Sequence, residues 1–165
     1  HLEDRTAVDR MRQLRGIDEK HLLTLLCRDL SELSQYAQVD NRQFRFLKEW
    51  TPGAYTFILP ATREVPRRLM HPSRKTVGLR VPEAPIVQAL LAELGVPLLC
   101  ASLILPGDEN PLSDPDDIED RIGKRIDLLV DGGAGQLEAT SVIDVTGDEP
   151  VIQRVGLGPV EAMLR

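Results

Sequence analysis

TVGLRVPEAPIVQALLAELGVPLLCASLILPG, residues 76–107, is the stretch that decides the fold. Its opening run, residues 76–81, contains β-branched side chains and predicts a short strand. Pro82 and Pro85 then close the strand and open a helix, because proline fixes φ and is tolerated in the first helical turn. Between Pro85 and Leu94 the apolar residues recur at helical spacing, so a helix should follow the strand.

A second apolar run follows this helix. Gly95 is a helix stop, and residues 98–101 predict another strand. A strand, a crossover helix and a second strand form a unit in which polar groups just past a strand end can meet a ligand. Arg80, Ser102 and the Pro106-Gly107 turn lie at or beside such ends. We therefore expect the centre of a functional site here.

Composition limits the class of protein. The chain has 165 residues, 42% of them apolar, which suits one globular domain with a real core. It contains no run of eighteen apolar residues and no basic-then-apolar leader, so we expect no membrane span, no secretory signal and a cytoplasmic protein. Cys27 and Cys100 each lie in an apolar run without a CxxC partner, which favours two reduced, buried thiols over a disulfide framework or a zinc site.

The charges are unevenly distributed. The formal net charge is −6, from 20 basic and 26 acidic side chains, which argues against a surface built for non-specific nucleic-acid binding. Acidic residues crowd segment 108–120, and basic residues gather in segments 10–28 and 63–80. A local basic face on an acidic protein therefore remains open.

The rest of the chain predicts further helices and strands. The expected helices are residues 1–16, a helix from Asp29 or Ser31 to about Gln38, one from Asp40 or Asn41 through Trp50, residues 64–70, one from Pro115 or Asp116 to about Gly123, and a short final helix. The expected strands lie within 18–27 and at 55–59, 127–130, 141–145 and 151–154, the last two as a hairpin. The opening helix has no evident cap. We expect a mixed α/β sheet of about six or seven strands.

Six phrases occur in a characteristic order along the chain. They are LLTLLCRDLSEL from Leu22, TPGAYTFILPATREVPRRLM from Thr51, TVGLRVP from Thr76, GVPLLCASLILPG from Gly95, DLLVDGG from Asp127 and TSVIDVTGDEPVIQRVG from Thr140. Together they resemble the YrdC/YciO family, and specifically its YciO branch, over nearly the whole chain. The resemblance implies an α/β fold with a twisted sheet, flanking helices and a concave surface that binds a ligand or RNA.

The resemblance also implies an activity. YrdC-type relatives make threonylcarbamoyl-adenylate from L-threonine, bicarbonate and ATP, with Mg²⁺ on the ATP, and release diphosphate. This is the first step of the threonylcarbamoyladenosine (t6A) modification of tRNA. We therefore expect a nucleotide-binding protein with weak or specialised synthase activity. The alternative is a non-catalytic binder of double-stranded RNA or tRNA that uses arginines on the concave surface.

Three departures separate this sequence from the synthases. The family normally begins with a strand and a PTDT-like segment, which nothing before His1 supplies, so we expect an N-terminally incomplete YrdC-like domain over residues 1–165. The K-x-R motif corresponds to Arg15-Gly16-Ile17, and the S-A-N motif corresponds to Ser102-Leu103-Ile104. These losses are typical of the YciO branch and leave a nucleotide pocket plausible.

Arginine is the residue type expected around a triphosphate and a carboxylate, because its planar fork donates to such groups in pairs. The resemblance places Arg15, Arg80 and Arg154 there, with Ser102 as a further phosphate donor. The competing interpretation of each arginine is a solvated surface charge.

A second set of residues is expected on the substrate side. The resemblance implies that the hydroxyls of Thr140 and Ser141 face the substrate, with Thr56 and His21 as weaker candidates. Ordinary strand composition and surface exposure are the competing interpretations. The acidic segment 108–120 lacks the spacing and glycine of an EF-hand, so we expect no protein-held metal.

Overall fold

The computed structural model describes residues 1–164. Its helices are α1 (Arg5–Arg15), α2 (Leu30–Tyr36), α3 (Asn41–Trp50), α4 (Pro85–Leu94) and α5 (Pro115–Ile122), with short 3-10 helices η1 (Arg67–Leu69), η2 (Gly123–Arg125) and η3 (Glu161–Leu164). Its strands are β1 (Thr24–Leu26), β2 (Tyr55–Pro60), β3 (Thr76–Arg80), β4 (Leu98–Cys100), β5 (Ser141–Asp144) and β6 (Val151–Arg154). The predicted mixed α/β fold is confirmed.

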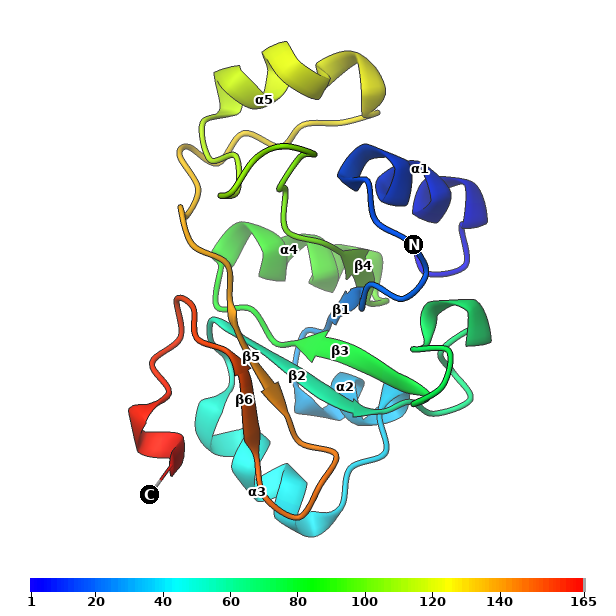
Figure 1. Ribbon diagram of the computed structural model, residues 1–165, viewed down its shortest axis with the longest axis vertical. Helices are drawn as coiled ribbons and strands as arrows, with labels where there is room; N and C mark the ends of the chain where they lie inside the picture. Colours follow the sequence, from blue (N-terminus) through cyan, green and yellow to red (C-terminus); the bar gives the residue numbers. More distant parts are fainter. Residues whose placement is uncertain (165) are drawn as a thin grey trace.

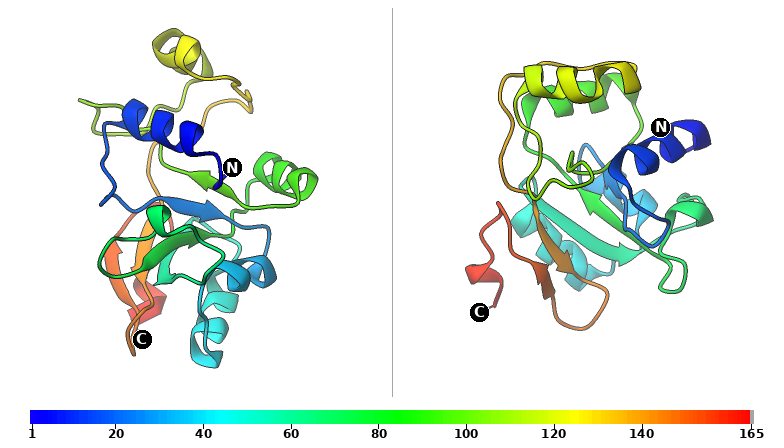
Figure 2. Two further views of the ribbon diagram at one scale, coloured as in Figure 1. Left: turned by 90° about the vertical axis from the view of Figure 1, so that its right-hand side faces the viewer. Right: turned by 45° about the horizontal axis from the view of Figure 1, so that its top comes forward.

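The six strands form one sheet in the order β4-β1-β3-β2-β5-β6. The pairs β1/β3 and β2/β5 are parallel, and the other neighbours are antiparallel. Figures 1 and 2 show α2 and α3 together on one side of the sheet, with α1, α4 and α5 toward the other side. The two sides of the sheet therefore face different surroundings.

The core lies between the sheet and helices α2 and α3. Leu25, Phe57 and Leu79 point into it from three strands, and Leu33 and Leu47 meet them from α2 and α3; all five are fully buried. Because side chains alternate along a strand, the neighbouring residues of the same strands face the opposite side. That second face carries the candidate site.

Side-chain caps begin the two core helices as the sequence predicts. The Asp29 carboxylate accepts the Glu32 backbone N–H at 2.8 Å, and the Asp40 carboxylate accepts the Gln43 N–H at 2.7 Å. Gln43 completes a capping box at α3 and also donates to the Val145 carbonyl at 2.7 Å. The caps fix where both helices start against the sheet.

The expected strand, crossover helix and second strand are all present, but β3 and β4 are not neighbours in the sheet. β4 pairs antiparallel with β1, and β1 separates it from β3. Gly95 ends α4 with a left-handed φ of 68°, and the chain turns back into β4 along the sheet edge. An order of strand, helix and strand does not by itself fix the direction of the second strand.

Three further expectations are corrected. Residues 127–130 form no strand; Leu128 and Val130 are 77% and 50% exposed in the segment that follows η2, where no strand pairs with them. The opening helix does have a cap, because the Asp4 carboxylate accepts the Ala7 N–H at 2.9 Å. The helix expected at 64–70 is only the 3-10 turn η1.

Candidate functional site

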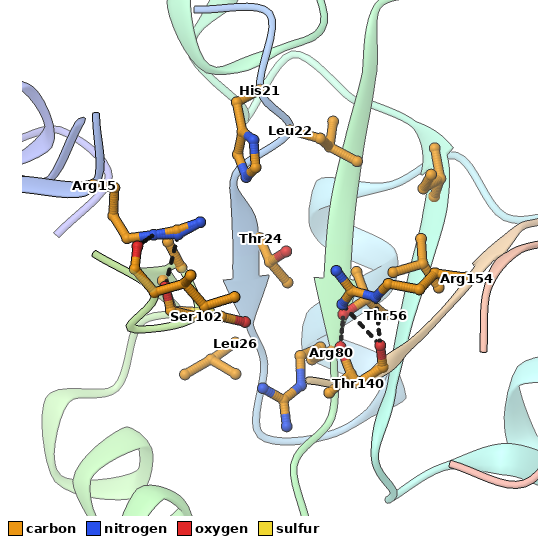
Figure 3. A pocket seen from close by; sticks show the side chains of 15 residues that line it. Arg15, His21, Leu22, Thr24, Leu26, Thr56, Arg80, Ser102, Thr140 and Arg154 are labelled. Atoms are coloured by element: carbon orange, nitrogen blue, oxygen red, sulfur yellow. Dashed lines mark hydrogen bonds between the residues drawn. The ribbon is translucent and has the colours of Figure 1, made fainter. Parts of the chain in front are cut away.

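A cavity of about 330 Å³ lies on the sheet face opposite α2 and α3 (Figure 3). Its volume falls in the range of small-molecule sites. We call it the arginine cavity; its lining residues are Arg15, His21, Leu22, Thr24, Leu26, Thr56, Ile58, Arg80, Cys100, Ala101, Ser102, Ile104, Thr140, Val142 and Arg154. Seven of the eight predicted site residues line it, and their individual roles remain predictions.

Strand register brings several of these residues together. Leu26 of β1 pairs with Arg80 of β3, and Val142 of β5 pairs with both Thr56 of β2 and Arg154 of β6. Paired residues in a sheet point to the same face. Side chains separated by more than 120 positions in the sequence therefore form one continuous floor.

Arg15 reaches the cavity from the last residue of α1. Gly16 ends this helix with a left-handed φ of 62°, which a glycine adopts without strain. The Arg15 Nε donates to the Ile104 carbonyl at 3.0 Å, and its Nη1 donates to the Ser102 carbonyl at 2.8 Å. Partial burial lowers the pKa of its guanidinium. Arg15 thus joins α1 to the loop after β4.

Arg154 stands on the opposite wall of the cavity (Figure 3). Its Nε and Nη2 both donate to the Thr140 carbonyl, at 3.1 and 2.8 Å. The hydroxyls of Thr140 and Thr56 lie 2.8 Å apart and share a hydrogen bond. The two hydrogen bonds to the Thr140 carbonyl hold the Arg154 side chain beside the start of β5, and its charge remains at the cavity.

Arg80 lies between these two walls and differs from both arginines. Its Nε is buried and has no hydrogen-bond partner among the described residues. Burial lowers the pKa of its guanidinium, and the nearby Cys100 thiol opposes this shift. A desolvated cation without an acceptor is costly in a folded protein. An anionic ligand in the cavity would supply the missing acceptor.

His21 and Cys100 add two neutral polar groups. Burial, and then the positive charge of Arg15, lower the pKa of the His21 imidazole, while Asp18 opposes them. Burial raises the pKa of the Cys100 thiol to about 11, and Arg80 opposes that shift. At neutral pH the imidazole can both donate and accept, and the thiol keeps its proton.

The prediction that Ser141 faces the substrate is wrong. Its side chain is fully buried, its Oγ donates to the Gly158 carbonyl at 2.5 Å, and the same Oγ accepts the Gly156 N–H at 2.9 Å. Thr140 and Ser141 are consecutive, so alternation prevents both from facing one side. Thr140 lines the cavity, and Ser141 anchors the segment after β6.

Thr24, Leu26 and Cys100 also line the cavity and were not among the predicted site residues. Thr24 and Leu26 flank the core residue Leu25, which places them together on the opposite face. The single threonine within an apolar run was the signal that one face of this strand is polar. Within residues 1–164, no three His, Cys, Asp or Glu side chains gather where they could hold a metal ion.

Charge defines what this site can attract. Three arginines line the cavity, and among the described residues that line it none is acidic. This is a local excess of positive charge on a chain whose formal net charge is −6. With hydroxyls and an imidazole beside the arginines, the cavity has the donors that bind phosphates and carboxylates.

Comparison with known proteins agrees with this fold. The family model Sua5/YciO/YrdC, described as "Telomere recombination", matches residues 1–156, and the chain belongs to this family. Within the family it is similar to the protein YciO of Escherichia coli K12, with 52% identity over 163 residues that make up 99% of this chain and 79% of that protein. The predicted resemblance is confirmed.

Solved structures and an enzyme relative extend the comparison. The crystal structure of E. coli YciO aligns with a TM-score of 0.94 over 98% of this chain and 79% of its own. Sua5 of P. abyssi, complexed with L-threonine, aligns with a TM-score of 0.86 at 26% identity, over 97% of this chain and 47% of its own. A threonylcarbamoyl-AMP synthase of Vibrio vulnificus (strain YJ016) is 26% identical over 92% of this chain and 82% of its own. No described helix is long and apolar enough to cross a membrane.

Proposed function

We propose that the arginine cavity binds an adenine nucleotide with L-threonine, and that the chain is a weak or specialised L-threonylcarbamoyladenylate synthase linked to t6A modification of tRNA. The observation that carries the proposal is the buried, unpartnered Nε of Arg80, between two further arginines in a cavity without acidic lining. The similarity to threonylcarbamoyl-AMP synthases and to a Sua5 that binds L-threonine supports the choice of substrates.

The reaction fits the charge of the site. The threonine amine and bicarbonate combine to a carbamate with loss of water, a carbamate oxygen attacks the α-phosphorus of ATP, and the bond to diphosphate breaks. Negative charge collects on the phosphate oxygens during the attack, so fixed cationic donors stabilise the transition state. Arg80 and the carbonyl-held Arg15 and Arg154 are the donors assigned to these oxygens, with Ser102 beside Arg15. Mg²⁺ enters bound to the phosphates of ATP.

Thr56, Thr140 and His21 are assigned to the threonine side. The paired hydroxyls of Thr56 and Thr140 offer one free acceptor or donor each, and the neutral imidazole of His21 can hydrogen-bond an ammonium or hydroxyl neighbour. Ile104 lines the cavity where the synthase motif has asparagine, which removes one amide hydrogen-bonding group. That loss is the reason for proposing weak rather than efficient turnover.

The test is a reaction of the chain with L-threonine, bicarbonate and Mg-ATP. We expect diphosphate and threonylcarbamoyl-adenylate to form together, more slowly than with a YrdC-type enzyme run in parallel. Omission of either threonine or bicarbonate should abolish both products. If the YrdC-type enzyme turns over and this chain does not, synthase activity is excluded. Calorimetry with ATP would then show whether the chain still binds the nucleotide.

Binding of double-stranded RNA or tRNA is the second candidate function. The observation that favours it is a run of exposed cations around η1, namely Arg63, Arg67, Arg74 and Lys75. Phosphate contacts make RNA affinity fall steeply with salt. A gel-shift titration with tRNA should therefore weaken strongly between low and physiological salt; no shift at low salt would remove this candidate.

A further inference from the structure

A second hollow lies where the parallel neighbours β1 and β3 end. After β1 the chain enters α2 on the core side of the sheet, and after β3 it enters α4 toward the other side. When the segments that follow two adjacent parallel strands turn to opposite sides of the sheet, a crevice opens at the carboxyl ends of those strands. This position lies outside the arginine cavity.

The hollow has a volume of about 480 Å³. We call it the strand-end hollow; it is lined by Arg28, Asp29, Leu30, Lys48, Thr51, Pro52, Val81, Pro82, Glu83 and Gln88. Leu30, Pro52, Val81 and Pro82 give it apolar walls. No residue lines both this hollow and the arginine cavity.

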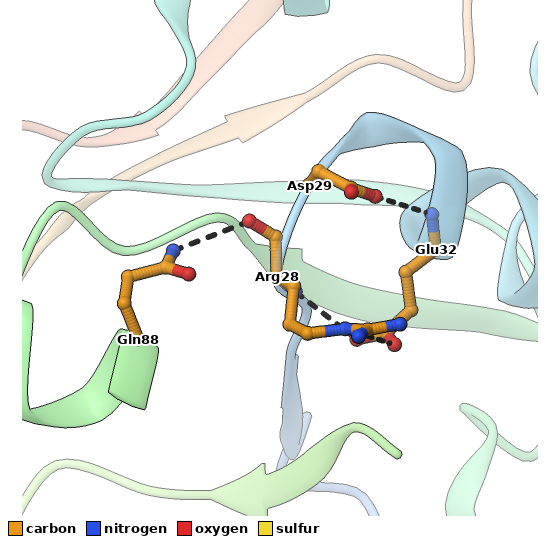
Figure 4. Close-up of polar contacts among 4 residues, drawn as sticks. All are labelled: Arg28, Asp29, Glu32 and Gln88. Carbon is orange, nitrogen blue, oxygen red and sulfur yellow. Dashed lines mark hydrogen bonds and ion pairs between the residues drawn. The ribbon is translucent and has the colours of Figure 1, made fainter. Parts of the chain in front are cut away.

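Its polar rim is held in place by a buried carboxylate (Figure 4). The Glu32 side chain is only 5% exposed, and its two oxygens accept the backbone N–H and the Nε of Arg28, each at 3.0 Å. The Arg28 side chain is 41% exposed, and its terminal nitrogens donate to no acceptor within residues 1–164. Glu32 therefore fixes Arg28 through one edge and leaves the other edge free.

Gln88 fixes the opposite side of the hollow. Its Nε2 donates to the Arg28 carbonyl at 3.2 Å (Figure 4). The same Nε2 donates to the Pro82 carbonyl at 2.6 Å, so Gln88 ties together the chain segments that follow β1 and β3. Its Oε1 accepts no hydrogen bond from the described chain. The hollow thus has a rim that hydrogen bonds hold in place, and the Gln88 Oε1 is an acceptor that the described residues leave unused.

Both signs of charge line this hollow. Arg28 and Lys48 are cationic, and Asp29 and Glu83 are anionic; Asp29 already caps α2, whereas Lys48 and Glu83 form no ion pair within the described residues. A purely anionic ligand would meet repulsion from Glu83, and a purely cationic one would meet repulsion from Lys48. A ligand that carries one charge of each sign matches the lining.

We propose that the strand-end hollow binds a small zwitterion of the amino-acid class with an apolar side chain, either a free amino acid or a dipeptide. Its carboxylate pairs with Arg28 and Lys48, its ammonium with Glu83 and the Gln88 amide oxygen, and its side chain lies on Leu30, Pro52 and the two residues after β3. This site is separate from the proposed synthase site and does not depend on it.

The test is a titration of the ¹⁵N-labelled chain followed by NMR. We expect L-leucine or the dipeptide Leu-Leu to shift the amides of Arg28, Val81 and Gln88 in a saturable manner; the tighter of the two identifies the source of the zwitterion. N-acetyl-leucine lacks the ammonium and leucinamide lacks the carboxylate, so both should bind more weakly. Equal binding by either would overturn the proposal, as would shifts confined to Arg80 and Arg154.

Two charge variants test the assigned contacts. Lys48 and Glu83 are exposed, so Lys48→Gln and Glu83→Gln should leave the fold unchanged, as thermal unfolding checks. Each should weaken leucine or Leu-Leu binding about fivefold, the effect of one partly exposed charge contact. The matched control is Lys124→Gln, an exposed lysine outside the hollow, which should bind as the parent does. Unchanged affinity in both charge variants would refute the contacts.

Discussion

The arginine cavity and the strand-end hollow both lie beside β1 and β3 but carry different charge. Leu26 and Arg80 face the first, and Arg28 and Val81, two residues and one residue further along the chain, line the second. In the first, the cations face no acidic lining residue, and Arg80 is left without an acceptor. In the second, a buried glutamate already holds the arginine. Under the two proposals, a ligand supplies the acceptor that Arg80 lacks, whereas Arg28 already has one acceptor within the protein.

The largest expected effect is a loss of ATP binding when Arg80, the arginine without an acceptor, is replaced. Arg80→Gln should weaken ATP binding roughly 10- to 100-fold, because a hydrogen bond to a charged group contributes about 1.5–3 kcal/mol. The melting temperature should stay the same or rise, since the variant removes a desolvated charge without breaking a protein hydrogen bond. Calorimetry and thermal unfolding measure the two quantities.

Arg63→Gln is the matched control, because Arg63 is exposed and lies outside both sites. It should change neither affinity nor melting temperature. An Arg80→Gln variant that binds ATP like the parent would contradict the assignment of Arg80 to the nucleotide.

The second prediction concerns stability instead of binding. Glu32→Gln keeps the size of the side chain but removes the charge that holds Arg28, so we expect a loss of about 1–2 kcal/mol in the free energy of unfolding. Urea unfolding measures it. Glu49→Gln, at an exposed position of α3, should cost almost nothing; an equal cost in both variants would mean that the pair contributes nothing specific.

A glycine in the cavity floor gives a smaller effect. A Cβ on Gly78 would lie 3.0 Å from the Thr24 Oγ1 and 3.3 Å from the Thr56 Cγ2, and both threonines line the arginine cavity. Gly78→Ala should therefore displace Thr24, destabilise by about 1 kcal/mol and weaken ligand binding severalfold. The double variant with Thr24→Ala should recover part of the stability, because the crowding atom is gone. If the stability losses of Gly78→Ala and Thr24→Ala simply add in the double variant, residues 78 and 24 do not interact.

The smallest effect is a pH dependence from His21. The folded-state pKa of this imidazole lies below its ordinary value of 6.5, so protonation favours the unfolded chain. Its contribution to stability is complete above pH 6.5 and is lost as pH falls from there to the lower folded-state pKa. His21→Gln should flatten the stability profile in that window and leave it unchanged above it. Identical profiles for parent and variant would show that the ring is fully solvated.

Alternation and register explain which site residues the sequence could predict. Arg80, Thr56 and Arg154 follow from strand assignments that were correct to within a residue, and the family resemblance chose them among many polar residues. The family motif assigned the neighbouring hydroxyls of Thr140 and Ser141 to the same face. Consecutive residues of an extended segment face opposite sides, so Ser141 points away from the cavity.

Other features depend on partners that are distant in the sequence. The antiparallel direction of β4 is set by its pairing with β1, some 75 residues earlier. Arg15 reaches Ser102 and Ile104 only because α1 packs beside the loop after β4. The apolar run 127–130 lacks a strand partner, so local pattern alone predicted a strand that tertiary structure does not form.

The two walls of the arginine cavity are held by different kinds of contact. Arg80, Thr56 and Arg154 stand on strands whose hydrogen-bonded ladders allow little displacement, whereas Arg15 and Ser102 are joined only through backbone carbonyls of an irregular segment. If the proposed ligand binds, we expect a larger one to displace the loop side of the cavity more readily than the sheet side. Under the proposed function, tolerance for different acyl groups would then reside in residues 102–107, the loop that follows β4.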